Sequence, residues 1–255
     1  MRVSVIAPVL NEAPSIRPFL RHLRGRAPGA EVIVVDGGSD DGTPARTGGL
    51  CDRLLEGPRG RAAQMNLGAR HAGGDALWFL HADCEVPPDG LAALAGALDD
   101  AGVAGGCFRV RLPRREWIYR VHDGLAHPVG RWLRIRCGDH GIFARRAAFD
   151  AAGGYPLVPL MEDVELFRAL HAHGRLAWLD TRLRISARRH EQVGVYRYTV
   201  VCALIVALYC AGARPPALAR LYARLVPPRE GRRGGLPPVE DALFPGFREP
   251  EPAGP

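Results

Sequence analysis

The sequence predicts an α/β fold in which a mixed, mostly parallel sheet is flanked by helices. Short apolar runs alternate with amphipathic stretches along the first half of the chain, which is the order expected of βαβ units. A chain of 255 residues with 47% apolar and 24% charged residues is also long enough, and ordinary enough in composition, to form one main domain. Acidic residues follow several of the apolar runs, as they do at the ligand-binding edge of such sheets.

The first βαβ unit is the clearest. Residues 3–7 and residues 31–36 (EVIVVD) predict two buried strands. Between them Pro14 suits the first turn of a helix, whose apolar residues recur at a spacing of three and four up to Leu23. The segment GGSDDGT (residues 37–43) is predicted to be a loop.

The alternation continues beyond this unit and becomes less regular after residue 110. Strands are predicted over 52–55, 76–80, 106–112, 141–144, 176–179 and 183–187; helices are predicted through 64–69, from Pro87 and Pro88 to 98, and over 161–173; residues 116–133 are amphipathic.

These elements suggest one domain over residues 1–190, with halves 1–110 and 111–190. Residues 191–226 form an apolar, helical C-terminal segment. After Pro227 the chain has the composition of a disordered tail.

The chain carries a net charge of +7, and all 34 basic residues are arginine. Arginine forms bidentate contacts with phosphate, so this charge suits phosphorylated ligands, anionic headgroups or nucleic acid. A solvated basic surface or a biased base composition would explain it equally well. Because no basic segment is interleaved with aromatic residues, we expect no nucleic-acid partner.

Two features bear on cellular location. The six cysteines form no CxxC pair, so we expect reduced, mostly buried thiols and a cytoplasmic protein. The N-terminal apolar run is too short for a signal peptide and is better interpreted as a strand.

Residues 198–213 contain no charge, but sixteen residues fall short of the ~20 that span a bilayer. We expect a helix that is buried in the core, forms a homodimer, or lies on the inner membrane surface. Arg197, Arg214 and Arg220 flank it and would meet anionic headgroups in the last case.

Acidic residues mark the carboxyl ends of three predicted strands. Asn11 and Glu12 follow the first strand, Asp36 ends the second, and Asp83 follows the central one. Such a carboxylate can accept from a nucleobase or a ribose hydroxyl, although Asp36 could equally cap its own turn. Asp83 also suits a divalent cation whose other ligands are substrate phosphates. Neither GxGxxG nor a P-loop is present.

Six motifs occur in order: PVLNE, VVDGGSDDGT, GRAAQMNLGA, FLHAD, GGY and MEDVEL. Together they resemble a family 2 glycosyltransferase of the GT-A fold, over roughly residues 1–190. Within that family the chain looks similar to small bacterial cytosolic enzymes associated with radical-SAM and selenium-related gene neighbours.

The resemblance implies roles for residues in the first half, which would bind the nucleotide. Pro8, Glu12 and Asp36 would line the nucleoside pocket, and Arg61 and Asn66 would flank it or the diphosphate.

The resemblance also implies a metal, Mn²⁺ or Mg²⁺, that Asp83 coordinates through the diphosphate. Such families usually carry DxD at this point, whereas this chain has His81, Ala82 and Asp83. His81 could bind the metal, donate to the ribose, or only pack.

Inverting sugar transfer requires a base opposite the leaving diphosphate, and Glu162 and Asp163 are the candidates. They fall in the first turn of a predicted helix, where the helix dipole favours anions. The resemblance makes Asp163 the base and Glu162 a positioning group; otherwise both are plain first-turn acids.

Two further groups have open roles. Asp139 and His140 would hold the donor sugar or acceptor, or merely form a glycine-flanked turn. Arg188, Arg189 and His190 would close over the diphosphate, or form a basic surface cluster.

The expected activity is therefore metal-dependent, inverting transfer from a UDP- or GDP-linked sugar to an acceptor hydroxyl. A sugar-phosphate nucleotidyltransferase is one alternative, but it would need a glycine-rich basic loop where this chain has LNEAPS. The other is a non-catalytic nucleotide-sugar-binding protein, which would keep Asp36 and Asp83 without needing Asp163.

Overall fold

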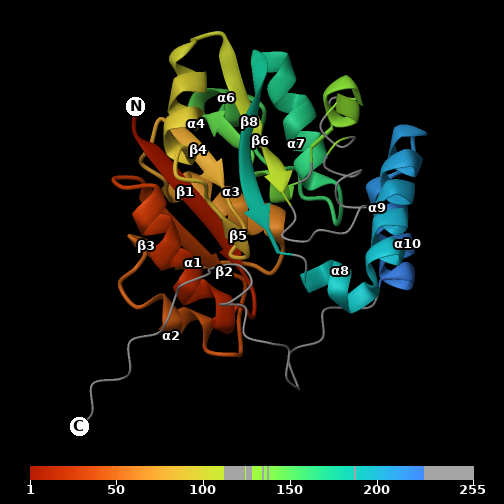
Figure 1. Ribbon diagram of the computed structural model, residues 1–255, viewed down its shortest axis with the longest axis horizontal. Coiled ribbons are helices and arrows are strands. Elements are labelled where there is room, and N and C mark those ends of the chain that lie inside the picture. Colours follow the sequence, from red (N-terminus) through yellow and green to blue (C-terminus); the bar gives the residue numbers. More distant parts are fainter. Residues whose placement is uncertain (112–123, 125–127, 134, 137, 187, 227–255) are drawn as a thin grey trace.

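The computed structural model describes residues 1–111, 124, 128–133, 135–136, 138–186 and 188–226. Its centre is an eight-stranded mixed sheet in the order β3-β2-β1-β4-β7-β6-β8-β5 (Figure 1). The strands are β1 (Val3–Val9), β2 (Glu31–Asp36), β3 (Arg53–Glu56), β4 (Ala76–Phe79), β5 (Cys84–Glu85), β6 (Val103–Arg111), β7 (Phe143–Arg145) and β8 (Arg175–Ile185).

The first four strands run parallel to one another, with β1 between β2 and β4. β7 is antiparallel to both β4 and β6, β6 is parallel to β8, and β5 is antiparallel to β8. Every residue of β1, β2 and β4 is buried, because helices cover both faces of this part of the sheet. The predicted α/β class with a mixed, mostly parallel sheet is confirmed.

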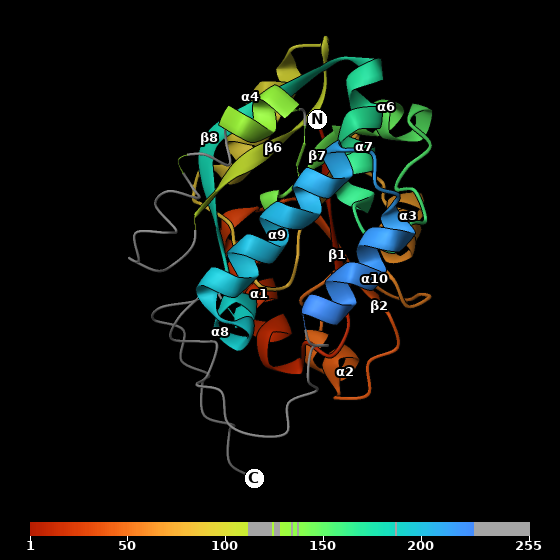
Figure 2. The same ribbon diagram turned by 90° about the vertical axis from the view of Figure 1, so that its right-hand side faces the viewer.

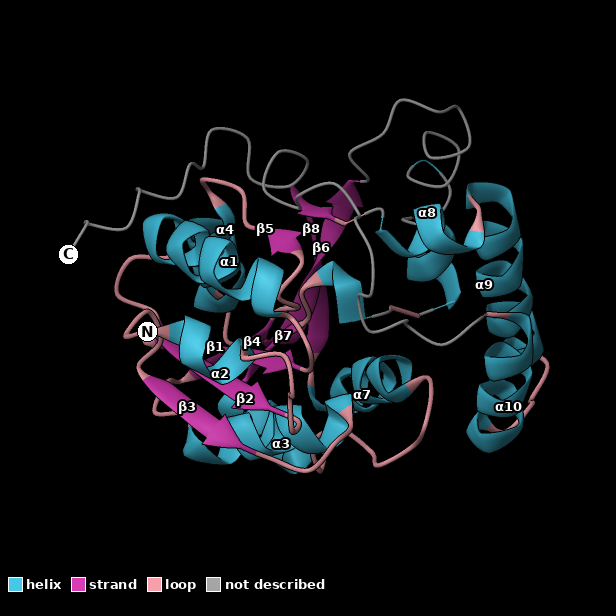
Figure 3. Ribbon diagram, turned by 90° about the horizontal axis from the view of Figure 1, so that it is seen from below, coloured by secondary structure: helices cyan, strands magenta, loops and turns pink. Residues whose placement is uncertain are grey.

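Helices α1 and α4 pack on one face of the sheet, and α3, α6 and α7 pack on the other. Beyond α7, helices α9 and α10 form an outer layer with a small core of its own (Figures 1 and 3). The helices are α1 (Ala13–Arg26), α2 (Thr43–Thr47), α3 (Arg61–His71), α4 (Gly90–Asp99), α6 (Arg146–Ala151), α7 (Glu162–Leu170), α8 (Arg188–Val193), α9 (Val195–Cys210) and α10 (Pro215–Leu225), with 3₁₀ turns at Gly138–His140 and His171–His173.

The structure corrects several predicted boundaries. The two strands predicted over 176–179 and 183–187 are one strand, β8, because the pairing with β6 shifts register at Phe108 and Arg109 and then continues. The helix predicted from Pro87 begins later, at Gly90. The loop predicted over 37–43 ends at Thr43, where the short helix α2 begins.

Four short elements were not predicted: α2, β5, α6 and α8. They have five, two, six and six residues, which is too short for hydrophobic periodicity to reveal.

Some predictions concern residues outside the described part of the chain. These are the tail from 227 to 255 and most of the amphipathic stretch 116–133, of which residues 128–133 are helical. Among the described cysteines all five are free, but only Cys84 and Cys107 are buried, so the expectation of mostly buried thiols was wrong.

Candidate functional site

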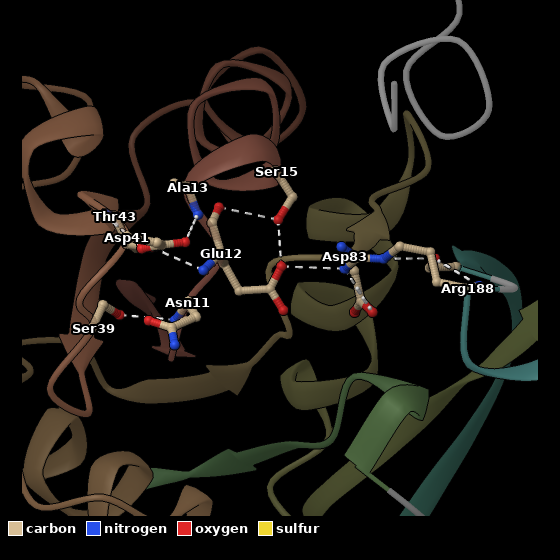
Figure 4. Close-up of polar contacts among 10 residues, drawn as sticks. Asn11, Glu12, Ala13, Ser15, Ser39, Asp41, Thr43, Asp83 and Arg188 are labelled. Atoms are coloured by element: carbon tan, nitrogen blue, oxygen red, sulfur yellow. Dashed lines mark hydrogen bonds and ion pairs between the residues drawn. The ribbon is translucent and has the colours of Figure 1, made fainter. Parts of the chain in front are cut away.

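A polar network joins the two loops that follow β1 and β2. The backbone N–H groups of Asn11, Glu12 and Ala13 donate to Ser39 Oγ, Thr43 Oγ1 and Asp41 Oδ2, at 2.9, 2.8 and 2.9 Å (Figure 4). Asn11 adopts a left-handed conformation (φ 55°), which asparagine tolerates better than most residues. The network fixes Glu12 at the start of α1.

Asp41 lies at the centre of this network. Burial alone would raise the pKa of its carboxyl, but hydrogen bonds from the Thr43 hydroxyl and from the N–H groups of Ala13 and Thr43 outweigh burial and lower it. The ionised carboxylate therefore holds the α1 and α2 starts together.

Asp36 caps its own turn in this structure. Its Oδ2 accepts from the N–H groups of Gly38 and Ser39 at 3.0 and 2.8 Å, and its Oδ1 accepts from Ser39 Oγ. Pro8 lies beside it in the sheet, where it pairs with Val35. Two of the three residues predicted to line a nucleoside pocket, Pro8 and Asp36, thus lie on neighbouring strands, and both are buried.

Sequence reasoning missed the structural role of Gln64. Its buried side-chain amide donates to the carbonyls of Val9 and Val35, at 2.9 and 2.8 Å. Gln64 therefore connects α3 to the ends of β1 and β2. A glutamine on the apolar side of a predicted helix was the available signal.

The structure brings Glu12, Asp83 and Arg188 together from distant parts of the chain (Figure 4). Arg188 Nη2 lies 3.2 Å from Glu12 Oε2 and 3.3 Å from Asp83 Oδ2. Burial of the guanidinium would lower its pKa, but the charges of Glu12 and Asp83 outweigh burial and raise it. Ser15 Oγ also donates to Glu12 Oε2, and Ser186 Oγ accepts from Arg188 Nε.

The surroundings of Asp83 fit a cation whose other coordinating oxygens come mainly from a bound substrate. Asp83 and His81 follow β4, and no group of three or more His, Cys, Asp or Glu side chains able to hold a metal occurs among the described residues. Asp83 is partly exposed, and it already faces a positive charge, that of Arg188. One carboxylate with open positions suits Mg²⁺ or Mn²⁺ when phosphates supply the other oxygens.

A second acidic group lies at the start of α7. Glu162 and Asp163 occupy its first turn and are 3% and 5% exposed, as the sequence predicted for their position on the helix. Glu162 Oε1 pairs with Arg61 Nη2 at 2.6 Å, which links α7 to the first residue of α3. Met161, just before them, is buried with φ 69°, a strained conformation for this residue.

Asn66 supports this second group indirectly. Its side chain donates to the Tyr155 carbonyl and accepts from the Tyr155 N–H, at 2.8 and 2.9 Å. Burial, followed by the charges of Asp163 and Glu162, raises the pKa of the Tyr155 hydroxyl. Asn66 thus fixes the backbone of Tyr155 near the two acids.

Two buried polar atoms at this second group have no hydrogen-bond partner among the residues that the structure describes. They are Glu162 Oε2 and the Tyr155 hydroxyl. An unpaired buried polar atom is costly, so a bound hydroxyl or water would be stabilised there.

The charges of Asp139 and Arg189 act on a thiol of α9. Burial raises the pKa of Cys202 on α9 to about 11; the charge of Asp139 also raises it, whereas that of Arg189 lowers it. The neighbouring His190 ring packs edge-on against Tyr198 at 4.7 Å between centroids, and His140 Nδ1 lies 3.2 Å from the Phe108 carbonyl. Arg188 is the member of the predicted basic cluster that pairs with Glu12 and Asp83.

Comparisons with known proteins agree with this architecture. An uncharacterized glycosyltransferase of Mycobacterium tuberculosis is 31% identical over 138 residues, which cover 51% of this chain and 53% of that protein. The chain thus spans about half the length of the curated relatives it matches.

Solved structures show the same fold. A mannosyltransferase of Pyrobaculum calidifontis, in complex with GDP-Man and Mn²⁺, superimposes with a TM-score of 0.64 and 24% identity over 87% of this chain and 69% of the other. Glucosyl-3-phosphoglycerate synthase of M. tuberculosis, in complex with Mg²⁺ and UDP, superimposes with a TM-score of 0.54 and 20% identity over 71% of this chain and 69% of the other.

The sequence profile of glycosyl transferase family 2 matches residues 4–155, more than half of the chain. This range contains both loops of the polar network, Asp83, Asn66 and Tyr155, while β8 and α7 complete the sheet and the second acidic group beyond it. The fold is the GT-A fold, and the chain belongs to glycosyl transferase family 2.

Proposed function

We propose that this chain transfers a sugar from a nucleotide-diphosphate sugar to an acceptor hydroxyl, with inversion and with a divalent metal. The observation that carries the proposal is the pair of acidic groups at the start of α7 and after β4, in a member of this family. The group after β4 suits a metal-bound diphosphate, and the group at the start of α7 suits a base.

Asp83 would hold the metal, Mn²⁺ or Mg²⁺, together with the diphosphate oxygens, and His81 would be an additional ligand. The metal, when bound, neutralises charge on the departing nucleoside diphosphate. Asp83 supports this role because its carboxylate is partly exposed and can therefore be reached by a bound diphosphate and its metal.

Asp163 would take the proton from the acceptor hydroxyl as that oxygen attacks the anomeric carbon. Its position in the first turn of α7 supports this role, because the helix dipole stabilises a negative charge there. Glu162 would position the acceptor: Oε1 is held by Arg61, and Oε2 is a buried acceptor to which a substrate hydroxyl could donate.

Pro8, Glu12 and Asp36 would form the nucleoside side of the donor site, in the half made by residues 1–110. Arg61 and Asn66 would flank the nucleoside or the diphosphate. In the half made by residues 111–190, Asp139 would hold the donor sugar or the acceptor, and Arg189 would close over the diphosphate. The nucleotides named for the solved structures of similar fold, GDP-Man and UDP, make GDP- and UDP-sugars the first donors to test. Within the family, we assign the chain to the small bacterial cytoplasmic enzymes that are associated with radical-SAM and selenium-related gene neighbours.

A donor panel tests the proposal. The full chain is heated with UDP-glucose, UDP-N-acetylglucosamine or GDP-mannose, each with and without Mn²⁺, and nucleoside diphosphate release is measured in parallel. We expect one donor to raise the melting temperature only with metal, since ligands of the native state stabilise it. Tight binding without release against any acceptor extract would favour a non-catalytic binding protein, and no shift with any donor would contradict the proposal.

A further inference from the structure

We propose that the outer face of the α9–α10 pair, defined by Tyr196, Val200, Leu204, Arg220 and Arg224, docks on an anionic lipid surface. This inference does not depend on the proposed transfer reaction, because it concerns a face of the molecule that both acidic groups leave unused. Figure 2 shows α9 and α10 side by side, facing the viewer, on the outside of the molecule.

The first observation is an exposed apolar stripe along α9. Tyr196, Val200 and Leu204 are 57, 64 and 42% exposed. Their spacing of four residues places them on one side of the helix. Exposed alanines at 203, 207 and 211 widen the stripe, and single exposed apolar residues would not form such a row.

The stripe is a fixed feature because the opposite side of α9 is anchored. The Tyr209 hydroxyl donates to Glu165 Oε1 on α7 at 2.6 Å, and Arg168 Nη1 donates to that hydroxyl at 3.2 Å. Val201 and Ile205 are buried in the small core beneath. The helix therefore cannot rotate to bury the stripe without breaking these contacts.

The second observation is the charge around the stripe. Residues 195–226 contain four arginines and no aspartate or glutamate. Arg197, Arg214, Arg220 and Arg224 are all exposed. On α10, Arg220 and Arg224 are one turn apart, on the side opposite the buried Leu218. Arg197 also fastens α9 to α10, since its Nη2 donates to the Leu225 carbonyl at 2.9 Å.

An anionic lipid surface complements both observations. A shallow apolar stripe enters the boundary between headgroups and acyl chains, while neighbouring arginines meet the headgroup phosphates. A second copy of the chain fits less well, because a twofold interface places the same patch on both subunits and would bring these arginines towards one another. No helix in the described part of the chain is long and apolar enough to cross a membrane.

Vesicle co-sedimentation of the full chain tests the inference, without donor or metal. We expect the protein to sediment with vesicles of phosphatidylcholine and phosphatidylglycerol, to stay in solution with phosphatidylcholine alone, and to be released by salt. Arg220→Gln with Arg224→Gln should weaken binding about tenfold or more, since each basic residue near an anionic surface contributes substantially. Val200→Ser with Leu204→Ser should weaken it severalfold at every salt concentration.

Matched controls lie on other faces. Arg46→Gln with Arg70→Gln removes the same charge from exposed sites on α2 and α3, and Leu54→Ser replaces a leucine on β3 that is 40% exposed. Both should bind vesicles like the parent. Equal losses in control and test variants would overturn the inference, as would failure of the parent to bind anionic vesicles at low salt. A dimer in sedimentation velocity that Val200→Ser with Leu204→Ser dissociates would assign the face to a second copy instead.

Discussion

Arg188 Nη2 lies 3.3 Å from Asp83 Oδ2, so a guanidinium from α8 faces the carboxylate that we assign to a metal. The same nitrogen lies 3.2 Å from Glu12 Oε2. One positive charge thus joins the loops after β1 and β4 to the end of β8. Two acids that lie far apart in the sequence thus share one counter-charge.

Arg188→Gln should make Asp83 more available to a cation. We expect Mn²⁺ to bind the donor-free variant severalfold more tightly, a modest change because partly exposed ion pairs contribute little. Titration calorimetry with Mn²⁺ measures this, and Arg184→Gln, which removes a nearby arginine paired with Glu85, is the control. Weaker Mn²⁺ binding in Arg188→Gln would mean that Arg188 orients the carboxylate instead of competing for it.

Asp163→Asn should abolish transfer while preserving donor binding. The amide cannot accept the proton of the acceptor hydroxyl, and general-base catalysis contributes a factor of roughly 10² to 10⁴. Nucleoside diphosphate release gives the rate, and the donor-induced melting shift gives binding. Glu165→Gln changes another acid of the same turn, one that accepts from Tyr209, and should retain most activity. Unchanged turnover in Asp163→Asn would remove the base assignment.

The Arg61–Glu162 ion pair should couple the two halves of the domain. Arg61→Gln leaves the nearly buried Glu162 without this partner, and we expect a loss of about 1–3 kcal/mol in the free energy of unfolding. Glu162→Gln in the same chain should restore part of it. Urea unfolding of the parent, both single variants and the double variant yields the coupling energy, and additive losses would show that the pair contributes no such coupling.

Two glycine substitutions should have opposite effects on stability. A Cβ at Gly106 would collide with the Ala177 carbonyl oxygen and the Phe143 ring, so Gly106→Ala should cost about 1–3 kcal/mol. Gly96, on the exposed side of α4, has open space, so Gly96→Ala should add about 0.5–1 kcal/mol. Thermal and urea denaturation measure both. A stable Gly106→Ala variant would show that β6 and β8 can separate more readily than their packing suggests.

Asp41 should contribute to acid sensitivity. Its pKa in the folded protein lies below the usual 3.8, so its contribution is fully present above that value and is lost as pH falls through the folded pKa. Asp41→Asn should therefore be less stable than the parent near neutral pH, and the difference should narrow as the solution is acidified. Urea unfolding across this pH range tests the prediction, with the exposed neighbour Asp40→Asn as control. A difference that stays constant with pH would contradict it.

The sequence by itself determined the class of fold and the position of the principal acids along the chain. Buried strands are recognisable in the sequence as apolar runs. Because the carboxyl ends of parallel strands lie at the same sheet edge, acids that follow such runs lie near that edge, as Glu12, Asp36 and Asp83 do. The first-turn location of Glu162 and Asp163 was equally predictable, because helix periodicity begins directly after them.

Only the tertiary structure decided which of these side chains meet. Arg188 reaches Glu12 and Asp83, at the start of α1 and after β4, although it comes from the short helix α8, 176 and 105 residues later in the chain. The side-chain amide of Asn66 donates to the carbonyl of Tyr155, which is 89 residues away and is brought close only by the packing of α3. Pairings of this kind depend on the relative placement of elements, which local pattern and propensity do not encode.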